Sequence, residues 1–165
     1  MHIFDDVLDI DLIDRYKIKI ETHYLKMLSE GKKYDAWYPT RNFKLGPNDS
    51  VVPLVQEILF QQLGVYSDCL DCELQTWPIG IESKLHIHDA NDRETGDYNS
   101  LLYLNDDFYG GEFYTGNGIT IKPKKNRLTF FDGRKIYHGV RTVENQHRFT
   151  MIFWWGNTKK IKPIR

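Results

Sequence analysis

Residues 99–131 read NSLLYLNDDFYGGEFYTGNGITIKPKKNRLTFF. Short runs rich in Leu, Tyr, Phe, Ile and Thr alternate here with turn residues such as Asp-Asp, Gly-Gly and Gly-Asn-Gly. Aromatic and β-branched residues are typical of strands, and Gly, Asn and Asp are typical of the turns between them. This stretch therefore predicts a series of short strands and favours a mainly β fold.

The same pattern continues on both sides of this stretch and predicts eight strands. They are Glu73–Pro78, Lys84–His88, Asn99–Asn105, Gly111–Tyr114, Gly118–Ile121, Arg127–Phe131, Ile136–Arg141 and His147–Trp155. Eight short strands in one chain of this size indicate either a double-sheet jelly roll, also called a double-stranded β-helix, or a barrel.

The first third of the chain is predicted to contain two helices. Asp11 can cap a helix that runs to about Glu30, because apolar residues recur there at helical spacing. Ser50 can cap a second helix over Val52–Leu63. Each helix is followed by a glycine that suits its C-terminal cap, Gly31 and Gly64.

The length of 165 residues predicts one domain, 1–165. We expect a helical buttress over about 1–66 to pack outside a jelly-roll core over about 67–157. The net charge of −1 does not provide the basic field of a nucleic-acid-binding protein. No apolar run approaches the ~20 residues of a membrane span, and the acidic N-terminus does not resemble a signal peptide. With only two cysteines, we expect a cytoplasmic protein that binds neither nucleic acid nor membrane.

Three histidines are candidate metal ligands. His86 and His88 lie two residues apart on a predicted strand, so their side chains leave the same face. His138 lies on another predicted strand, and distant strands of a small barrel can meet in its interior. Three imidazoles on one face would hold a divalent first-row metal and leave other positions open. The spacing by itself favours ordinary strand histidines without a metal, because H-x-H pairs are common and His138 is distant in the sequence.

Arg148 lies on the strand that follows His138. A guanidinium inside a barrel needs a carboxylate partner, preferably a bidentate one. No acidic residue stands beside Arg148 in the sequence, so one hypothesis is that it binds the carboxylate of a ligand. The alternative is an ion pair with a distant Asp or Glu.

Residues 74–155 resemble the iron- and 2-oxoglutarate-dependent dioxygenases of the prolyl 4-hydroxylase type. The motifs that carry the resemblance follow one another in the family's order: Trp77-Pro78-Ile79-Gly80, His86 after a gap of five residues, Tyr103-Leu104-Asn105, Gly110-Gly111-Glu112, Phe130-Phe131, His138 and Arg148. The resemblance implies a jelly roll that uses Fe(II), 2-oxoglutarate and O₂, with ascorbate as a further reductant. It implies hydroxylation of an unactivated C–H bond, with a prolyl residue of a peptide or protein as the favoured substrate.

The resemblance also implies roles for individual residues. His86 matches the first metal ligand and His138 the second. Arg148 matches the residue that pairs with the far carboxylate of 2-oxoglutarate, and Tyr103 matches a tyrosine that bonds the same group. Trp77 either walls the cofactor pocket or fills the barrel.

The third metal ligand is where this chain departs from the family. The family has H-x-D, whereas residues 86–90 read HIHDA. His88 could be the ligand, which gives a three-histidine site one negative charge short. Asp89 could reach the metal through a slip of one residue. Alternatively, His88 could be the first ligand with Ala90 at the carboxylate position, as in the related halogenases, although the gap after the upstream glycine argues against this.

The sequence thus favours a 2-oxoglutarate-dependent dioxygenase over two alternatives. One is a halogenase or a three-histidine metal oxygenase with a small-molecule substrate. The other is a catalytically inactive jelly-roll binding module. Chloride dependence would favour the halogenase, and metal binding without 2-oxoglutarate turnover would favour the three-histidine oxygenase or the inactive module. The sequence does not indicate the oligomeric state.

Overall fold

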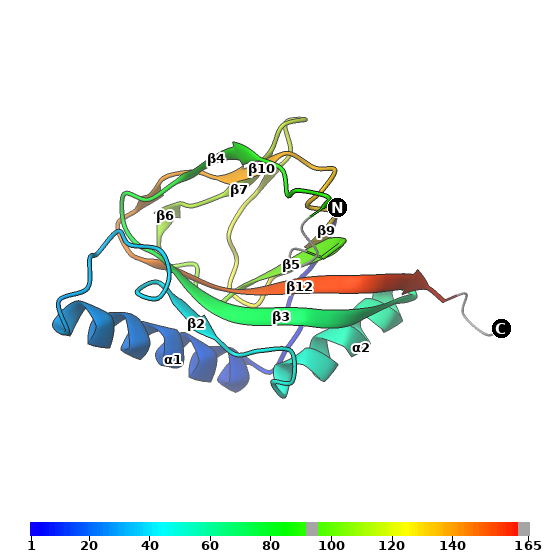
Figure 1. Cartoon of the computed structure of the whole chain (residues 1–165), viewed down its shortest axis with the longest axis horizontal. Helices are drawn as coiled ribbons and strands as arrows, with labels where there is room; N and C mark the ends of the chain where they lie inside the picture. Colours follow the sequence, from blue (N-terminus) through cyan, green and yellow to red (C-terminus); the bar gives the residue numbers. More distant parts are fainter. Residues whose placement is uncertain (92–95, 162–165) are drawn as a thin grey trace.

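The computed structural model describes residues 1–91 and 96–161 (Figure 1). Within these residues the elements are β1 His2–Phe4, α1 Ile10–Ser29, β2 Asn42–Lys44, α2 Val51–Leu63, β3 Val65–Trp77, β4 Ser83–His86, β5 Tyr98–Tyr103, β6 Tyr109–Gly110, β7 Phe113–Thr115, β8 Thr120–Ile121, β9 Leu128–Phe131, β10 His138–Val140, β11 Val143–Glu144 and β12 Arg148–Lys160. No helix in this part of the chain is long and apolar enough to cross a membrane.

The strands form two main antiparallel sheets and a small two-stranded one. The larger sheet has six strands in the order β1-β9-β5-β12-β3-β2, and the smaller has the order β4-β10-β7-β8. Strands β11 and β6 pair separately. Figure 1 shows the four-stranded sheet facing the six-stranded sheet across the interior. The predicted mainly β fold with two helices is confirmed.

Both helices lie against the six-stranded sheet, on the side away from the four-stranded sheet (Figure 1). They bury one face each because their apolar residues recur at helical spacing. The buried residues are Ile13, Tyr16, Ile20 and Tyr24 on α1 and Val51, Val52, Val55 and Leu59 on α2. Most of these side chains pack with Leu74, Leu102 and Met151 of the sheet in one hydrophobic core.

The helix ends differ from the prediction by a residue or two. Asp9, not Asp11, is the N-cap of α1, and its Oδ1 accepts a hydrogen bond from the Asp11 amide at 2.8 Å. Ser50 makes no side-chain capping bond, whereas Asp49 accepts one from the Val51 amide. Neighbouring polar residues compete for the same amides, so spacing alone does not select the cap.

Each of the eight predicted strands overlaps an observed strand, but the sheet is larger than predicted. Strand β3 begins at Val65 and β12 continues to Lys160, beyond the predicted 73–78 and 147–155. Strands β1 and β2 come from the first third of the chain, where only two helices were predicted, and they pair with β9 and β3. Each has three residues, too few to show a period of two.

The pairing of β12 brings distant residues together. Arg148 pairs with Trp77 of β3 on one side, and Thr150 pairs with Tyr103 of β5 on the other. Side chains two residues apart on a strand leave the same face, so Arg148 and Thr150 point to one side of the sheet. The intervening Phe149 joins the core on the helix side.

Truncation of Leu102 tests this packing. Leu102 is fully buried on β5, so Leu102→Ala should lower the free energy of unfolding by about 2–5 kcal/mol through lost burial and the cavity left behind. Ile18→Ala on the exposed side of α1 is the matched control, with an expected change within about 0.5 kcal/mol. Urea denaturation measures both, and equal effects would contradict the sheet–helix core.

Candidate metal centre and adjoining pocket

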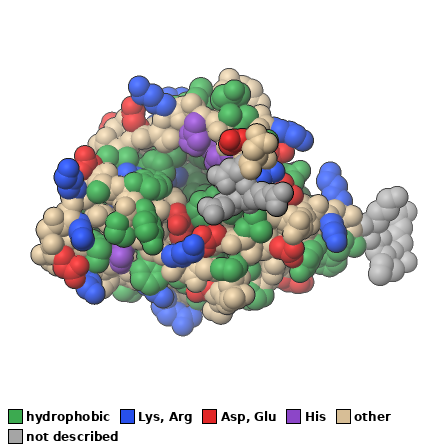
Figure 2. Space-filling model, viewed as in Figure 1, with side chains coloured by type: hydrophobic (Ala, Val, Ile, Leu, Met, Phe, Trp, Pro, Cys, Tyr) green, Lys and Arg blue, Asp and Glu red, His purple; other side chains and the backbone are tan. Residues whose placement is uncertain are grey.

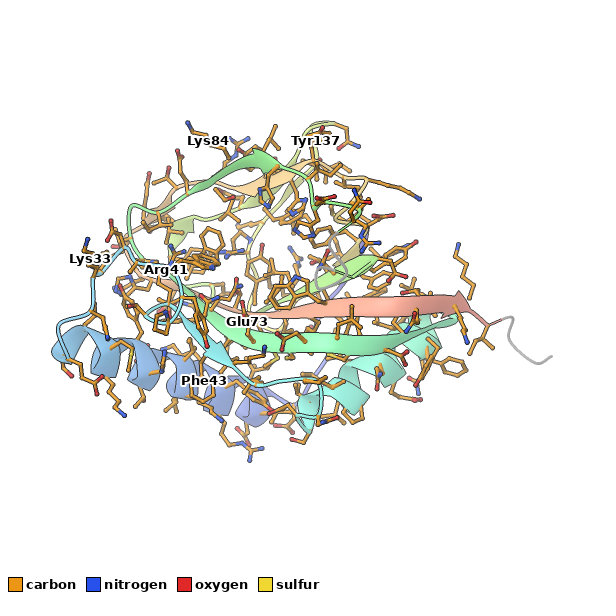
Figure 3. All side chains as sticks on the ribbon, in the orientation of Figure 1. Lys33, Arg41, Phe43, Glu73, Lys84 and Tyr137 are labelled. Atoms are coloured by element: carbon orange, nitrogen blue, oxygen red, sulfur yellow. The ribbon has the colours of Figure 1, made fainter. Side chains whose placement is uncertain are left out.

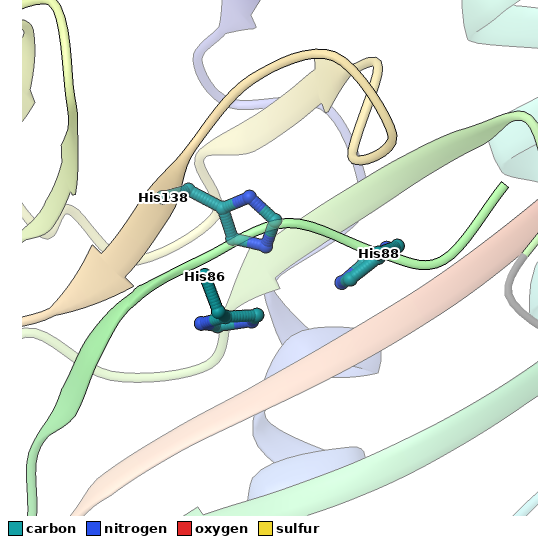
Figure 4. A group of neighbouring side chains, drawn as sticks. All are labelled: His86, His88 and His138. Atoms are coloured by element: carbon teal, nitrogen blue, oxygen red, sulfur yellow. The ribbon is translucent and has the colours of Figure 1, made fainter.

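The structure brings His86, His88 and His138 together at one end of the smaller sheet (Figure 4). His86 ends β4 and His138 begins β10, and the two pair directly across the sheet. The ring centroids of His138 lie 4.5 Å from those of His86 and 4.8 Å from those of His88. One ligand nitrogen from each ring lies within 4.8 Å of the others, and no Asp or Glu of the described residues belongs to this group.

Backbone carbonyls orient two of the three rings. The His86 Nδ1 lies 2.9 Å from the Lys84 carbonyl oxygen, and the His138 Nδ1 lies 2.7 Å from that of Ile136. A carbonyl oxygen only accepts, so each Nδ1 carries the proton and each Nε2 keeps a free lone pair. This is the tautomer that binds a metal through Nε2, and these residues therefore fit a metal ion.

His138 is the most buried of the three. It packs between Phe113 and Phe131, with ring centroids 5.4 and 5.0 Å away. Burial lowers the pKa of His138 to about 4, and the nearby His86 and His88 lower it further in the same direction. The hydrogen bond to the Ile136 carbonyl opposes the shift. His138 is therefore neutral at neutral pH, as a metal ligand must be.

The segment 86–90 presents His88 to the cluster and turns Asp89 away from it. The His88 amide donates to the Gly133 carbonyl at 2.8 Å, which holds this segment against the β9–β10 loop. A Cβ atom on Gly133 would lie 2.5 Å from the His88 Nδ1, so the close approach requires glycine there. Asp89 is exposed, and its Oδ1 accepts from the Asn91 amide at 2.9 Å. Ala90 is exposed as well.

A pocket of about 390 Å³ adjoins the histidine cluster. Figure 2 shows this hollow, with hydrophobic side chains inside it and histidine side chains at its edge. The aromatic residues that line it are Trp37, Trp77, Phe113, Phe131 and Trp154. Its walls also include two arginines, Arg41 and Arg148. The pocket is therefore mostly apolar but carries two positive charges.

Arg148 is a fully buried cation. Its guanidinium carbon lies 5.2 Å from the ring centroids of both Trp77 and Tyr103. No carboxylate of the described residues forms a salt bridge with it, and its three guanidinium nitrogens and the Tyr103 hydroxyl are buried without a hydrogen-bond partner. Burial lowers the pKa of Arg148, and Tyr103 offsets this in part.

A buried charge without a partner destabilises a fold by several kcal/mol, whereas a bidentate carboxylate would satisfy it. The unpaired donors of Arg148 and Tyr103 therefore fit the carboxylate of an anionic ligand such as 2-oxoglutarate. The distant ion pair, the alternative considered for Arg148, is not present among the described residues.

Two polar residues of the pocket region were not found from the sequence. Arg41 follows a stretch without strand or helix periodicity, so nothing in the sequence marks it as buried. The Thr150 hydroxyl is buried without a hydrogen-bond partner, on the same face as Arg148 and opposite Tyr103. Its position two residues after Arg148 could have indicated it.

The family model described as the 2OG-Fe(II) oxygenase superfamily matches residues 74–156. This range holds the histidine cluster, Arg148 and Tyr103, and it covers half of the chain. The chain belongs to the 2OG-Fe(II) oxygenase superfamily.

Curated relatives match a shorter part of the chain. Prolyl 3-hydroxylase 2 of Rattus norvegicus is 41% identical over 66 residues, which are 36% of this chain and 9% of that protein. Prolyl 3-hydroxylase 3 of Homo sapiens is 42% identical over 65 residues, 35% of this chain and 9% of that protein. The match therefore spans about a tenth of each relative.

Solved structures share the fold over nearly the whole chain. A prolyl-4-hydroxylase of Pseudomonas putida has a TM-score of 0.67 at 18% identity, covering 94% of this chain and 91% of that one. The viral collagen prolyl hydroxylase of Paramecium Bursaria Chlorella virus-1, solved as a 2OG complex, has a TM-score of 0.63 at 18% identity, covering 98% and 96%. AviO1 of Streptomyces viridochromogenes has a TM-score of 0.69 at 15% identity, covering 96% and 90%.

Substitution at His88 and Asp89 tests which residue completes the metal site. His88→Ala should weaken Fe(II) binding by more than about a hundredfold, because even loss of a residue that only supports a ligand weakens metal binding about 10- to 100-fold. Asp89→Ala should leave Fe(II) binding unchanged, since its carboxylate lies outside the cluster.

Anaerobic equilibrium dialysis with Fe(II) measures both variants, and circular dichroism verifies that each is folded. The opposite result, with Asp89 required and His88 dispensable, would contradict the three-histidine site.

Proposed function

We propose that this oxygenase hydroxylates an unactivated C–H bond with Fe(II), 2-oxoglutarate and O₂, and that its substrate is a prolyl residue. One observation carries the proposal: the histidine cluster and the unpaired guanidinium of Arg148 line the same pocket. A metal beside a buried carboxylate receptor is the arrangement that a chelating 2-oxo acid requires. The prolyl assignment is supported by the names of the relatives, which are prolyl 3- and 4-hydroxylases.

In this proposal His86, His88 and His138 would hold Fe(II), with His86 and His138 each binding it through Nε2. Three protein ligands on one side of the ion leave its remaining positions open for ligands. All three are neutral, so this site would carry one negative charge fewer than one with two histidines and a carboxylate. We expect it to bind Fe(II) more weakly for that reason.

Arg148 and Tyr103 would hold the far carboxylate of 2-oxoglutarate, and Trp77 would form a wall of the same subsite. The guanidinium offers two parallel N–H donors to the carboxylate, and the phenol offers a third. The Thr150 hydroxyl adds a fourth donor on the same face of the sheet. These unsatisfied donors lie on one face of the larger sheet. They would allow a carboxylate of 2-oxoglutarate to bind deep in an apolar pocket.

Bound Fe(II) with 2-oxoglutarate and O₂ would supply the oxidising chemistry. The residues of the chain bind and orient the reactants. Phe113 and Phe131 pack around His138 and would exclude water from the inner side of the metal site.

We further propose that the two facing sheets are the double-stranded β-helix and that 1–165 folds as one domain, with α1 and α2 as its buttress.

The all-histidine ligand set favours a second candidate, an oxygenase that binds the same metal without 2-oxoglutarate. A halogenase would also need a vacant ligand position, and the presence of a third histidine in the cluster does not favour one. Turnover that depends on chloride would support the halogenase, and metal-dependent turnover without 2-oxoglutarate would support the second candidate.

Anaerobic titration with Fe(II) and then 2-oxoglutarate tests the proposal. A weak visible charge-transfer band should appear when the 2-oxo acid chelates the iron. The band should be lost in Arg148→Ala and in Arg148→Met, which fills more of the space and separates the loss of charge from a cavity. Arg141→Ala is the matched control, because Arg141 also stacks on an aromatic ring, Tyr114, but is exposed.

Each result separates the candidates. A band that depends on Arg148 supports the cosubstrate site. Iron binding without a band contradicts the use of 2-oxoglutarate and supports a three-histidine oxygenase. Absence of iron binding supports the inactive binding module instead.

A further inference from the structure

The second arginine of the pocket, Arg41, has no role in the function proposed above. It lies just before β2, is 4% exposed and is held in place from both sides. The Arg41 Nε donates to the Thr76 carbonyl at 2.9 Å. In return, the Thr76 amide donates to the Arg41 carbonyl at 2.7 Å. Its Nη2 is buried without a hydrogen-bond partner among the described residues. Figure 3 shows this side chain on the pocket side of the larger sheet.

No acidic side chain of the described residues forms a salt bridge with Arg41. Of the described residues that line the pocket, Glu82 alone is acidic, and its Oε2 accepts from the Thr142 hydroxyl at 2.9 Å. Burial lowers the pKa of Arg41 to about 10, while Tyr24 and Asp35 raise it and Arg148 lowers it. Arg41 is therefore still a cation at neutral pH, and none of the described carboxylates forms a salt bridge with it.

The two arginines lie at different depths. The Arg41 guanidinium carbon is 4.1 Å from the ring centroid of Trp37, which is 44% exposed, and 5.1 Å from that of Trp77, which is 9% exposed. Arg148 also faces Trp77 but is fully buried. Arg41 therefore lies toward the mouth of the pocket and Arg148 at its base. One carboxylate at the base satisfies Arg148 and leaves Arg41 available.

We propose that Arg41 is a second anion subsite, which binds a free carboxylate of the substrate. This inference rests on the proposed function and narrows its substrate class. The substrate would be a proline-type compound with a free α-carboxylate, either the free imino acid or a C-terminal prolyl residue, rather than a residue inside a polypeptide.

The chemistry of the pocket mouth supports a small acid of this kind. A guanidinium matches a carboxylate in geometry and charge, whereas the amide carbonyl of an internal residue offers only a neutral acceptor. Trp37 and Trp77 pack edge to face beside the cation and line the pocket with apolar surface, which suits an apolar ring attached to the carboxylate. Binding of an internal residue would leave the Arg41 guanidinium without a carboxylate partner in the complex.

A matched pair of ligands tests the subsite without turnover. The probes are N-acetyl-L-proline and N-acetyl-L-prolinamide, which differ only in the carboxylate, and free L-proline is the third probe. Isothermal titration calorimetry is done under anaerobic conditions on protein loaded with Fe(II) and 2-oxoglutarate. The acid should bind at least about tenfold more tightly than the amide, since a hydrogen bond to a charged group is worth about that factor or more.

Substitution of Arg41 should remove this difference. Arg41→Gln should weaken binding of the acid roughly ten- to a hundredfold and leave the amide unchanged. It should keep the charge-transfer band and the affinity for 2-oxoglutarate. Arg141→Gln is the control and should change none of these. Arg41→Lys keeps the charge and should recover part of the preference for the acid.

Three results would overturn the inference. The first is that the wild-type chain binds the acid and the amide equally, or binds neither of them. This result decides the question even if the variants fail to fold. The second is an unchanged preference in a folded Arg41→Gln protein. The third is a loss of 2-oxoglutarate affinity in Arg41→Gln as large as that in Arg148→Ala, which would assign Arg41 to the cosubstrate. If the wild-type protein gives no charge-transfer band, the proposed function fails, and the acid–amide comparison on the metal-free protein still decides the role of Arg41.

Discussion

The register of β12 between β3 and β5 is the constraint on which the site depends. Along β12, Phe149, Met151, Phe153 and Trp155 enter the core beneath the helices, and Arg148, Ile152 and Trp154 line the pocket. Side chains alternate along a strand, so a slip of one residue would exchange the two sets. Such a slip would move the Arg148 guanidinium into the apolar core. It would also move the large aromatic side chains of the core into the pocket. The hydrophobic core thus fixes which face of β12 carries Arg148 and the other pocket residues.

The pocket carries positive charge that no negative charge of the described residues neutralises. Arg148 and Arg41 are buried cations that form no salt bridge with any described residue, and the histidine cluster contains no carboxylate of the described residues. A bound divalent metal would add further positive charge to the same cavity. Anionic ligands would neutralise the charges of Arg148, Arg41 and the metal together. The metal and 2-oxoglutarate should therefore each bind more tightly in the presence of the other. The neutral ligand set makes this coupling more important than in a site with its own carboxylate.

The sequence predicted the strands well where runs of aromatic and aliphatic residues are bounded by turn residues, as in 99–131, and less well where a strand has only two or three residues. β1 and β2 are too short to show a pattern, and the caps of both helices were shared among neighbouring polar residues. The structure places His88 beside His86 and turns Asp89 away, as the period of two on a strand would suggest. Arg41 could not be found, because its burial depends on the fold of the segment before β2 and on Trp37, and neither has a periodic signal.

The two halves of the site come from different sheets. The histidine cluster belongs to the smaller sheet and its adjoining loop, whereas Arg148, Tyr103 and Trp77 lie on the larger sheet, which α1 and α2 cover from outside. The distance between a metal and the carboxylate receptor is therefore set by how the sheets pack against each other. The contact of His138 with Phe131 bridges that space, because Phe131 lies on β9 of the larger sheet, whereas Phe113 lies on β7 beside His138 in the smaller sheet. In the proposed function, the Phe131 ring would therefore help to align the metal site with the cosubstrate site.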